Sequence, residues 1–193
     1  MKRFCYFLIV TFLSFLLFSC VSSRASEECS RVLSEPGIKS ADQLTNFFLA
    51  KNPDADKKQV FRLAKYYVAE CKTEGINSDC AFVQMCLETG FLTYGNLVTP
   101  DMNNFCGLGA IDAEHRGEYF ATEELGVRAH VQHLHAYSTT EESVLHNDLI
   151  DRRYKYVKPR GKAPTVFELA GTWAGDKEYG SKLDSLLSQL AAY

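Results

Sequence analysis

The sequence predicts a mainly α-helical domain over residues 40–193, with a small non-helical insertion between two of its helices. Helix-capping sequences recur along the chain, as at Ser40 and Thr165. Apolar residues at the three- and four-residue spacing of an amphipathic helix follow these caps. Residues 91–122 lack this spacing and are rich in Gly, Asn, Pro and aromatic residues. This segment is therefore expected to be a long loop with one short, irregular hairpin.

Residues 1–19 have the pattern of a signal peptide. A positively charged start precedes an apolar run at 4–18 that only Thr11 and Ser14 interrupt. As a helix this run would reach about 22 Å, less than the roughly 30 Å hydrocarbon core of a bilayer. We therefore interpret it as the apolar region of a signal peptide and expect the rest of the chain to be exported.

The Leu-Phe-Ser-Cys sequence at 17–20 resembles the lipobox of bacterial lipoproteins, in which the cysteine is acylated. This resemblance implies a lipid anchor on Cys20 that holds the protein to a membrane of the bacterial cell envelope, in the periplasm or at the surface. Ordinary signal cleavage after Ala25 is the alternative, because small residues precede that position. Residues 20–39 are rich in Ser and show no sustained periodicity, so we expect a tether there.

Three helices are expected in the first half of the domain. The first follows the capping box formed by Ser40 and Gln43. The second runs from about residue 54 to a glycine at 75. The third is capped by Ser78 or Asp79 and ends at Gly90, a residue type that favours helix ends.

Helical signals return after the insertion. Thr122 precedes two glutamates, which are favourable in the first turn of a helix. Thr165 and Glu168 form another capping box, and leucines between 183 and 190 define a last amphipathic helix.

The composition excludes several classes of protein. A formal net charge of −3 and a pI of about 6.0 argue against a nucleic-acid-binding protein. The chain has seven cysteines, of which Cys5 leaves with the signal peptide and Cys20 is lipidated or removed. At most two disulfides can form among the other five, and their pairing stays open. We expect no metal and no cofactor, since no Cys or His cluster has zinc-ligand spacing.

Two other polar groups have simple interpretations. His130 and His133 lie on one face of the predicted helix, but no third metal ligand follows at a familiar spacing. We expect them at the edge of the core or as polar lining of a cleft. The basic residues between 152 and 162 form a solvated face or attract the carboxylates of peptidoglycan stem peptides.

Glu88 is the first candidate for a chemical role. It stands in the last turn of an apolar helix, where the negative end of the helix dipole and apolar neighbours disfavour ionisation. A solvated surface glutamate is the alternative. A carboxyl group that stays protonated near neutral pH is suited to act as a general acid on a leaving oxygen.

The chain resembles the glucosaminidase domains of glycoside hydrolase family 73, which are peptidoglycan hydrolases with an α+β lysozyme-like fold. Four segments carry the resemblance in order: Glu-Thr-Gly at 88–90, Asn-Asn-Phe-Cys-Gly-Leu at 103–108, Gly-Val-Arg-Ala-His at 126–130 and Trp-Ala to Tyr at 173–179. The segment 156–164 is also similar to one branch of the family. The resemblance implies that the insertion forms one wall of the substrate cleft.

The resemblance also implies roles for individual residues. Glu88 matches the catalytic acid, and Tyr179 matches a tyrosine that lines the cleft and is implicated in catalysis. The substrate groove is expected to involve five residues, namely Tyr94, Asn103, Asn104, Phe105 and His130.

The second catalytic group is less clearly marked. Glu118 is the preferred candidate because it lies beside two aromatic residues in the most strand-like part of the insertion, with Glu114 and Asp112 behind it. A carboxylate about 6.5–9.5 Å from Glu88 would indicate an inverting mechanism, and one at about 5–5.5 Å a retaining mechanism. Without either, the 2-acetamido group of the substrate would act as the nucleophile.

The expected function is hydrolysis of the β-1,4 glycosidic bond after N-acetylglucosamine in peptidoglycan, by a monomer with Glu88 as general acid. Muramidase and lytic transglycosylase activities are the alternatives on the same fold. A non-catalytic lipoprotein that binds glycan strands is the alternative from another class.

Overall fold

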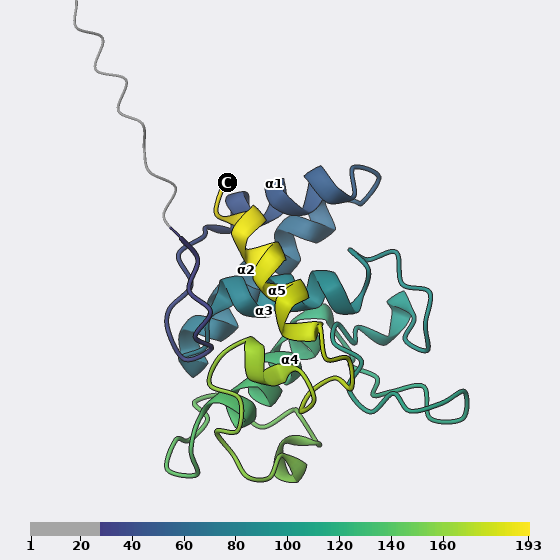
Figure 1. Ribbon diagram of the computed structural model, residues 1–193. Helices are drawn as coiled ribbons and strands as arrows, with labels where there is room; N and C mark the ends of the chain where they lie inside the picture. Colours follow the sequence, from purple (N-terminus) through teal and green to yellow (C-terminus); the bar gives the residue numbers. More distant parts are fainter. Residues whose placement is uncertain (1–27) are drawn as a thin grey trace, which may run out of the picture.

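The computed structural model describes residues 28–193 (Figure 1). The first helix, α1 (Ala41–Lys51), begins at the predicted capping box. The Ser40 hydroxyl accepts the backbone N–H of Gln43, and the Gln43 side chain accepts the N–H of Ser40. The pair satisfies two N–H groups that the first helical turn leaves without partners, which fixes the start of α1.

Helices α2 (Lys57–Glu74) and α3 (Ser78–Glu88) follow as predicted. Gly75 ends α2 in the left-handed conformation, with φ of 68°. Both predicted caps of α3, Ser78 and Asp79, are wrong, because the Asn77 side chain accepts the N–H groups of Asp79 and Cys80. All residues of α3 from Ser78 to Cys86 are buried, so this helix is the centre of the core.

The last two helices are α4 (Glu123–Ser138), capped by Thr122, and α5 (Tyr179–Leu190). α2 packs against α1, α3 and α4, and α5 crosses α3 (Figure 1). The capping box at Thr165 starts a single 3₁₀ turn, Phe167–Leu169, rather than a long helix. The expectation of a mainly helical domain is confirmed.

The segment between α3 and α4 forms the predicted insertion. In this segment the described elements are one 3₁₀ turn, Pro100–Met102, and an isolated antiparallel bridge between Ala110 and Arg116. Figure 1 shows it projecting to one side of the helices. The predicted short, irregular hairpin is therefore present, and it is reduced to a single bridge.

The N-terminal boundary of the domain needs a correction. Cys29 and Leu33 are buried in the core, and Val32 forms a bridge with Thr165. The backbone N–H of Leu33 also donates to the carbonyl of Pro164, and the Leu33 carbonyl accepts from the N–H of Asn77. Residues 28–39 are therefore part of the folded domain and not a tether, because they bury apolar side chains against distant parts of the chain.

The predictions for the signal peptide, for Cys20 and for residues 20–27 lie outside the described residues. Within residues 28–193, no helix has both the length and the apolar character needed to cross a bilayer.

The five cysteines of the described domain are all buried and all carry free thiols. Burial raises the pKa of the Cys29 thiol to about 11 and holds the pKa of the other four well above its usual value. Since the thiolate is the reactive form, these residues act as small apolar side chains of the core.

Gly126 in α4 lies against the backbone of Asn103 in the insertion, and this contact leaves no room for a side chain. A Cβ atom at this position would lie 1.8 Å from the carbonyl oxygen of Asn103. Gly126→Ala is therefore expected to lower the free energy of unfolding by about 2 kcal/mol, although alanine normally favours a helix. Urea denaturation would measure it. Gly175→Ala is the control, because a Cβ there meets no atom within 4 Å; equal stability of both variants would contradict the prediction.

Candidate active site

Glu88 lies at the C-terminal end of α3, where its half-buried side chain lines a cavity of about 280 Å³. Trp173 Nε1 donates a hydrogen bond of 3.1 Å to Glu88 Oε1, and the Tyr179 hydroxyl donates a second, short one to the same atom. Burial raises the pKa of Glu88, and the two hydrogen bonds lower it by a smaller amount. The carboxyl group therefore stays protonated to higher pH than an ordinary glutamate.

The cavity is formed by three parts of the chain. The end of α3 contributes Glu88, the insertion contributes residues between 94 and 110, and Trp173 closes the other side. Tyr94 lines the cavity, and its contact with substrate stays a prediction. Glu88 is the one aspartate or glutamate that lines the cavity in the described part of the chain.

Tyr179 belongs to a chain of hydrogen bonds that ends on Glu88. Gln84 Nε2 donates to the Tyr179 hydroxyl at 3.0 Å, so Gln84 Oε1 faces His130 and accepts from its Nε2 at 3.0 Å. His130 Nδ1 then accepts from the hydroxyl of Tyr67 at 2.8 Å. Each of these groups is at most 5% exposed. Because the Tyr179 hydroxyl accepts from Gln84, its own proton is donated to Glu88.

His130 therefore has a different position from the predicted one. It is fully buried and does not line the cavity, so the prediction that it binds substrate is corrected to a role inside the core. Burial, with a contribution from His133, lowers the pKa of His130 to about 3. The neutral ring can accept from Tyr67 and donate to Gln84 at the same time.

Replacing His130 by Phe is expected to lower the free energy of unfolding by about 2–4 kcal/mol, because the Tyr67 hydroxyl and the Gln84 amide oxygen lose their partner in the core. The difference from the wild type should shrink as pH falls from about 6.5 toward 3, since the unfolded state then binds a proton that folded His130 does not. Urea titrations at pH 7 and pH 4 measure both effects. His115→Phe, at an exposed position, is the control, and a constant difference between the two pH values would contradict the account.

The Asn-Asn-Phe turn supports the cavity more than it lines it. Asn103 has a left-handed backbone, with φ of 49°, and donates to the carbonyl of Phe120. Asn104 lines the cavity and holds the loop through the backbone of Leu108 and Glu118. Phe105 is 1% exposed and packs in the core, so its predicted contact with substrate is corrected to a structural role.

None of the candidates for a second carboxylate lines the cavity that holds Glu88. Glu118 lines a different cavity, where its Oε2 is 3.9 Å from Arg152 Nη1. Asp112 is exposed and bonded to His115, and Glu114 is exposed on the same turn. A catalytic role for Glu118 stays a prediction.

The sequence predicts no role for two residues at the site, although Trp173 lies in one of the segments that carry the family resemblance. Gln84 stands four residues before Glu88, one turn earlier on the same helical face, so a polar residue inside an apolar helix was the available signal. Trp173 contacts Glu88 across 85 positions of sequence, and periodicity cannot reveal such a contact. No group of three or more His, Cys, Asp or Glu suited to a metal ion occurs within residues 28–193.

Three comparisons relate the chain to known proteins. The family described as Glucosaminidase: Mannosyl-glycoprotein endo-beta-N-acetylglucosaminidase matches residues 64–192. An uncharacterized protein of Borreliella burgdorferi is 38% identical over 157 residues, which cover 81% of this chain and 76% of that protein. A crystal structure of S. aureus autolysin E in complex with the muropeptide NAM-L-Ala-D-iGlu has a TM-score of 0.54 at 14% identity, over 87% of this chain and 75% of the other. The match to the solved structure shows that the two proteins share a fold.

Proposed function

The chain belongs to the glucosaminidase family, and on this basis we propose that it hydrolyses the β-1,4 glycosidic bond after N-acetylglucosamine in the glycan strands of peptidoglycan. One observation supports the proposal most strongly. Glu88 lies in a cavity with its pKa raised by burial and with one oxygen held by Tyr179 and Trp173. This is the environment that a general acid requires.

The proton of Glu88 has a defined place in the proposed reaction. Oε1 accepts two hydrogen bonds, so the proton resides on Oε2, on the side of Gly107. Oε2 donates this proton to the glycosidic oxygen as the bond from that oxygen to C1 of N-acetylglucosamine breaks. Tyr179 and Trp173 then stabilise the carboxylate that forms.

The nucleophile follows from the lining of the cavity. Because Glu88 is the one carboxyl there among the described residues, we favour attack on C1 by the carbonyl oxygen of the substrate's own 2-acetamido group. Water then adds to C1 of this cyclic intermediate and gives a proton back to Glu88. Atoms and charges balance over the two steps, and no second carboxylate is needed.

Three further parts of the proposal rest on the sequence. Tyr94 and the Asn103 turn bind or shape the groove for the glycan. The signal-like segment at 1–19 directs export to the cell envelope, and a lipid on Cys20 anchors the protein to a membrane there. The protein acts as a monomer.

Lytic transglycosylation is the second candidate, because such a reaction also needs a single catalytic glutamate and one carboxyl lines the cavity among the described residues. Digestion of purified peptidoglycan, followed by mass spectrometry of the product ends, separates the possibilities. Reducing N-acetylglucosamine ends support the proposal. N-acetylmuramic acid ends would indicate a muramidase, and anhydro ends a lytic transglycosylase. Binding to insoluble wall without any product would leave a binding protein.

A further inference from the structure

A second cavity, of about 200 Å³, adjoins the one that holds Glu88. The two share four lining residues, namely Cys106, Gly107, Ala110 and Trp173. A third cavity, which contains Glu118, continues from the second and shares Arg153 with it. The shared residues place the three cavities one after another, from Glu88 past Trp173 to the basic segment near residue 153, and this row of cavities is called the groove below.

His133 and Asp151 form a fixed pair beside the second cavity. Asp151 is 1% exposed, and its Oδ2 lies 2.6 Å from Nδ1 of His133. The His133 ring lines the cavity, and its Nε2 makes no hydrogen bond within the described part of the chain. The pair therefore leaves one polar ring atom of His133 for a ligand.

Arg153 supplies a positive charge to the same cavity. The backbone N–H of Arg153 donates to Asp151 Oδ1 at 2.8 Å, so a single buried carboxylate orients both residues. Among residues 28–193, the Arg153 guanidinium has no acidic side chain within 4.0 Å and no hydrogen-bond acceptor. A half-buried guanidinium without a counter-charge attracts an anion, and its planar donors match a carboxylate.

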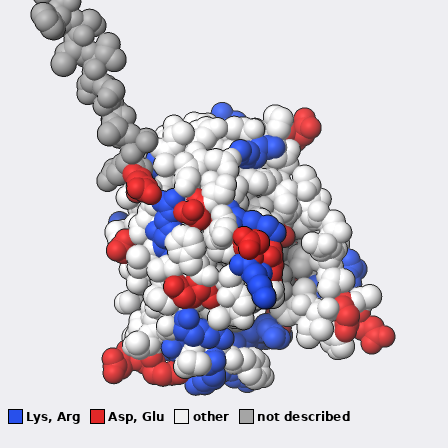
Figure 2. All heavy atoms as spheres, in the orientation of Figure 1, with Lys and Arg blue, Asp and Glu red and all other residues white. Residues whose placement is uncertain are grey.

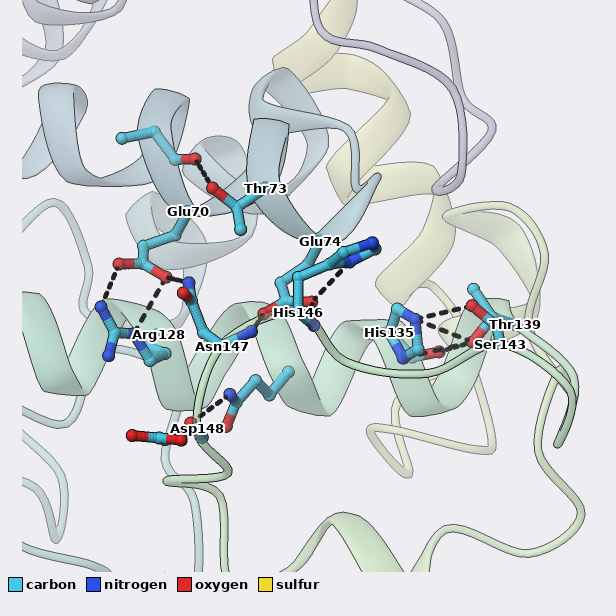
Figure 3. Close-up of polar contacts among 12 residues, drawn as sticks. Glu70, Thr73, Glu74, Arg128, His135, Thr139, Ser143, His146, Asn147 and Asp148 are labelled. Carbon is cyan, nitrogen blue, oxygen red and sulfur yellow. Dashed lines mark hydrogen bonds and ion pairs between the residues drawn. The ribbon is translucent and has the colours of Figure 1, made fainter.

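Side chains of α2 bind the segment that leads to these residues (Figure 3). Glu74, on α2, accepts the backbone N–H groups of His146 and Asn147 at 2.8 and 2.9 Å. Glu70 accepts from the Asn147 side chain and from Arg128. These buried contacts preorganise the chain immediately before Asp151 and Arg153, which lowers the entropy cost of binding a ligand there.

The surface around this end of the groove is also basic. Figure 2 shows Lys and Arg side chains gathered at the lower end of the molecule, where Figure 1 places the segment around residues 150–160. Arg152 and Lys155 line the third cavity beside Arg153. Negatively charged groups are therefore drawn toward the second cavity before they bind.

We propose that the second cavity binds a carboxylate of the peptide stem of peptidoglycan, with Arg153 as its partner and with His133 Nε2 accepting an amide N–H of the same stem. The inference rests on the proposed function, which places a glycan strand at Glu88. In that strand N-acetylmuramic acid is bonded directly to N-acetylglucosamine, and it carries the stem. The groove past Trp173 is the route by which the stem of this sugar reaches Arg153.

Calorimetric binding to the full chain with Glu88→Gln tests the proposal without turnover. The two probes are the disaccharide GlcNAc-MurNAc bearing L-Ala-D-iGlu, and the same compound with both carboxyl groups of its D-iGlu converted to amides. Arg153→Gln should weaken binding of the acidic probe about tenfold or more and change the amidated probe less than about twofold. Arg153→Lys should recover part of the loss. Lys158→Gln, on the same segment but at an exposed position outside these cavities, is the matched control.

Two outcomes overturn this inference alone: equal affinity of the acidic probe with and without Arg153→Gln, or equal losses for both probes. If neither probe binds the protein with intact Arg153, the proposed function fails together with the inference. Salt gives a check that requires no variant, because sodium chloride should weaken binding of the acidic probe more than that of the amidated one.

Discussion

Glu88→Gln is expected to reduce the rate of glycosidic bond cleavage in purified peptidoglycan by about 10³-fold or more. The glutamine keeps the shape of the side chain and an oxygen that can accept from Tyr179 and Trp173, but it has no proton to give to the leaving oxygen. The release of reducing ends measures the rate. Equal rates for the variant and the wild type would contradict the assignment of Glu88 as the acid.

The same substitution should not harm the fold. The pKa of folded Glu88 is raised by burial, so ionisation of this carboxyl group destabilises the folded state as pH rises. Relative to the wild type, Glu88→Gln should therefore become more stable as pH increases above about 4.3, the usual pKa of an unfolded glutamate. Urea unfolding at pH 4 and pH 7 distinguishes a loss of activity from a loss of structure.

Glu118→Gln is the matched comparison among the carboxylates. If the substrate's acetamido group is the nucleophile, this variant keeps activity within a few-fold of the wild type, because Glu118 does not line the Glu88 cavity. A loss as large as that of Glu88→Gln would instead identify Glu118 as the second catalytic group.

Tyr179→Phe is expected to lower kcat/KM by about 10- to 100-fold and to move the alkaline limb of its pH profile to higher pH. The Tyr179 hydroxyl donates to Glu88 and so favours the ionised carboxylate. Without this hydroxyl, the negative charge that forms on Glu88 after proton transfer is less stable, which lowers the rate. For the same reason the pKa of Glu88 rises, and the proton is retained to higher pH.

The direction of the pH shift separates this role from a structural one. A variant that only loosened the site would lose activity at every pH without moving the limb. Tyr94→Phe is the matched control, because Tyr94 lines the cavity and makes no hydrogen bond with Glu88 in the described structure. An alkaline limb that stays in place or moves to lower pH in Tyr179→Phe would contradict the account.

Local sequence signals predicted the helices well because their causes are local. The Ser40 capping box, the left-handed Gly75 and the Thr122 cap each act within one helical turn. The sequence of residues 28–39 predicts a tether because it has no periodicity of its own. Its order comes from contacts with Asn77 and Pro164, more than 40 and 100 residues away, and local patterns carry no record of such contacts.

The features of the site also differ in whether their causes are local in the sequence. The position of Glu88 at the end of an apolar helix was enough to predict a raised pKa. The donors that hold its Oε1 come from residues 173 and 179, after a segment with little regular structure. Family resemblance pointed to Tyr179, whereas the links through Gln84 and His130 required the packed structure.

A pH titration of the Glu88 carboxyl carbon by ¹³C NMR tests the central claim most directly, with Glu88→Gln used to assign the signal. The account predicts a titration midpoint clearly above about 4.3, the value of a glutamate in a peptide, because burial outweighs the hydrogen bonds from Tyr179 and Trp173. A midpoint at or below that value would mean that Glu88 is an ordinary ionised carboxylate near neutral pH, and it would contradict its role as the general acid.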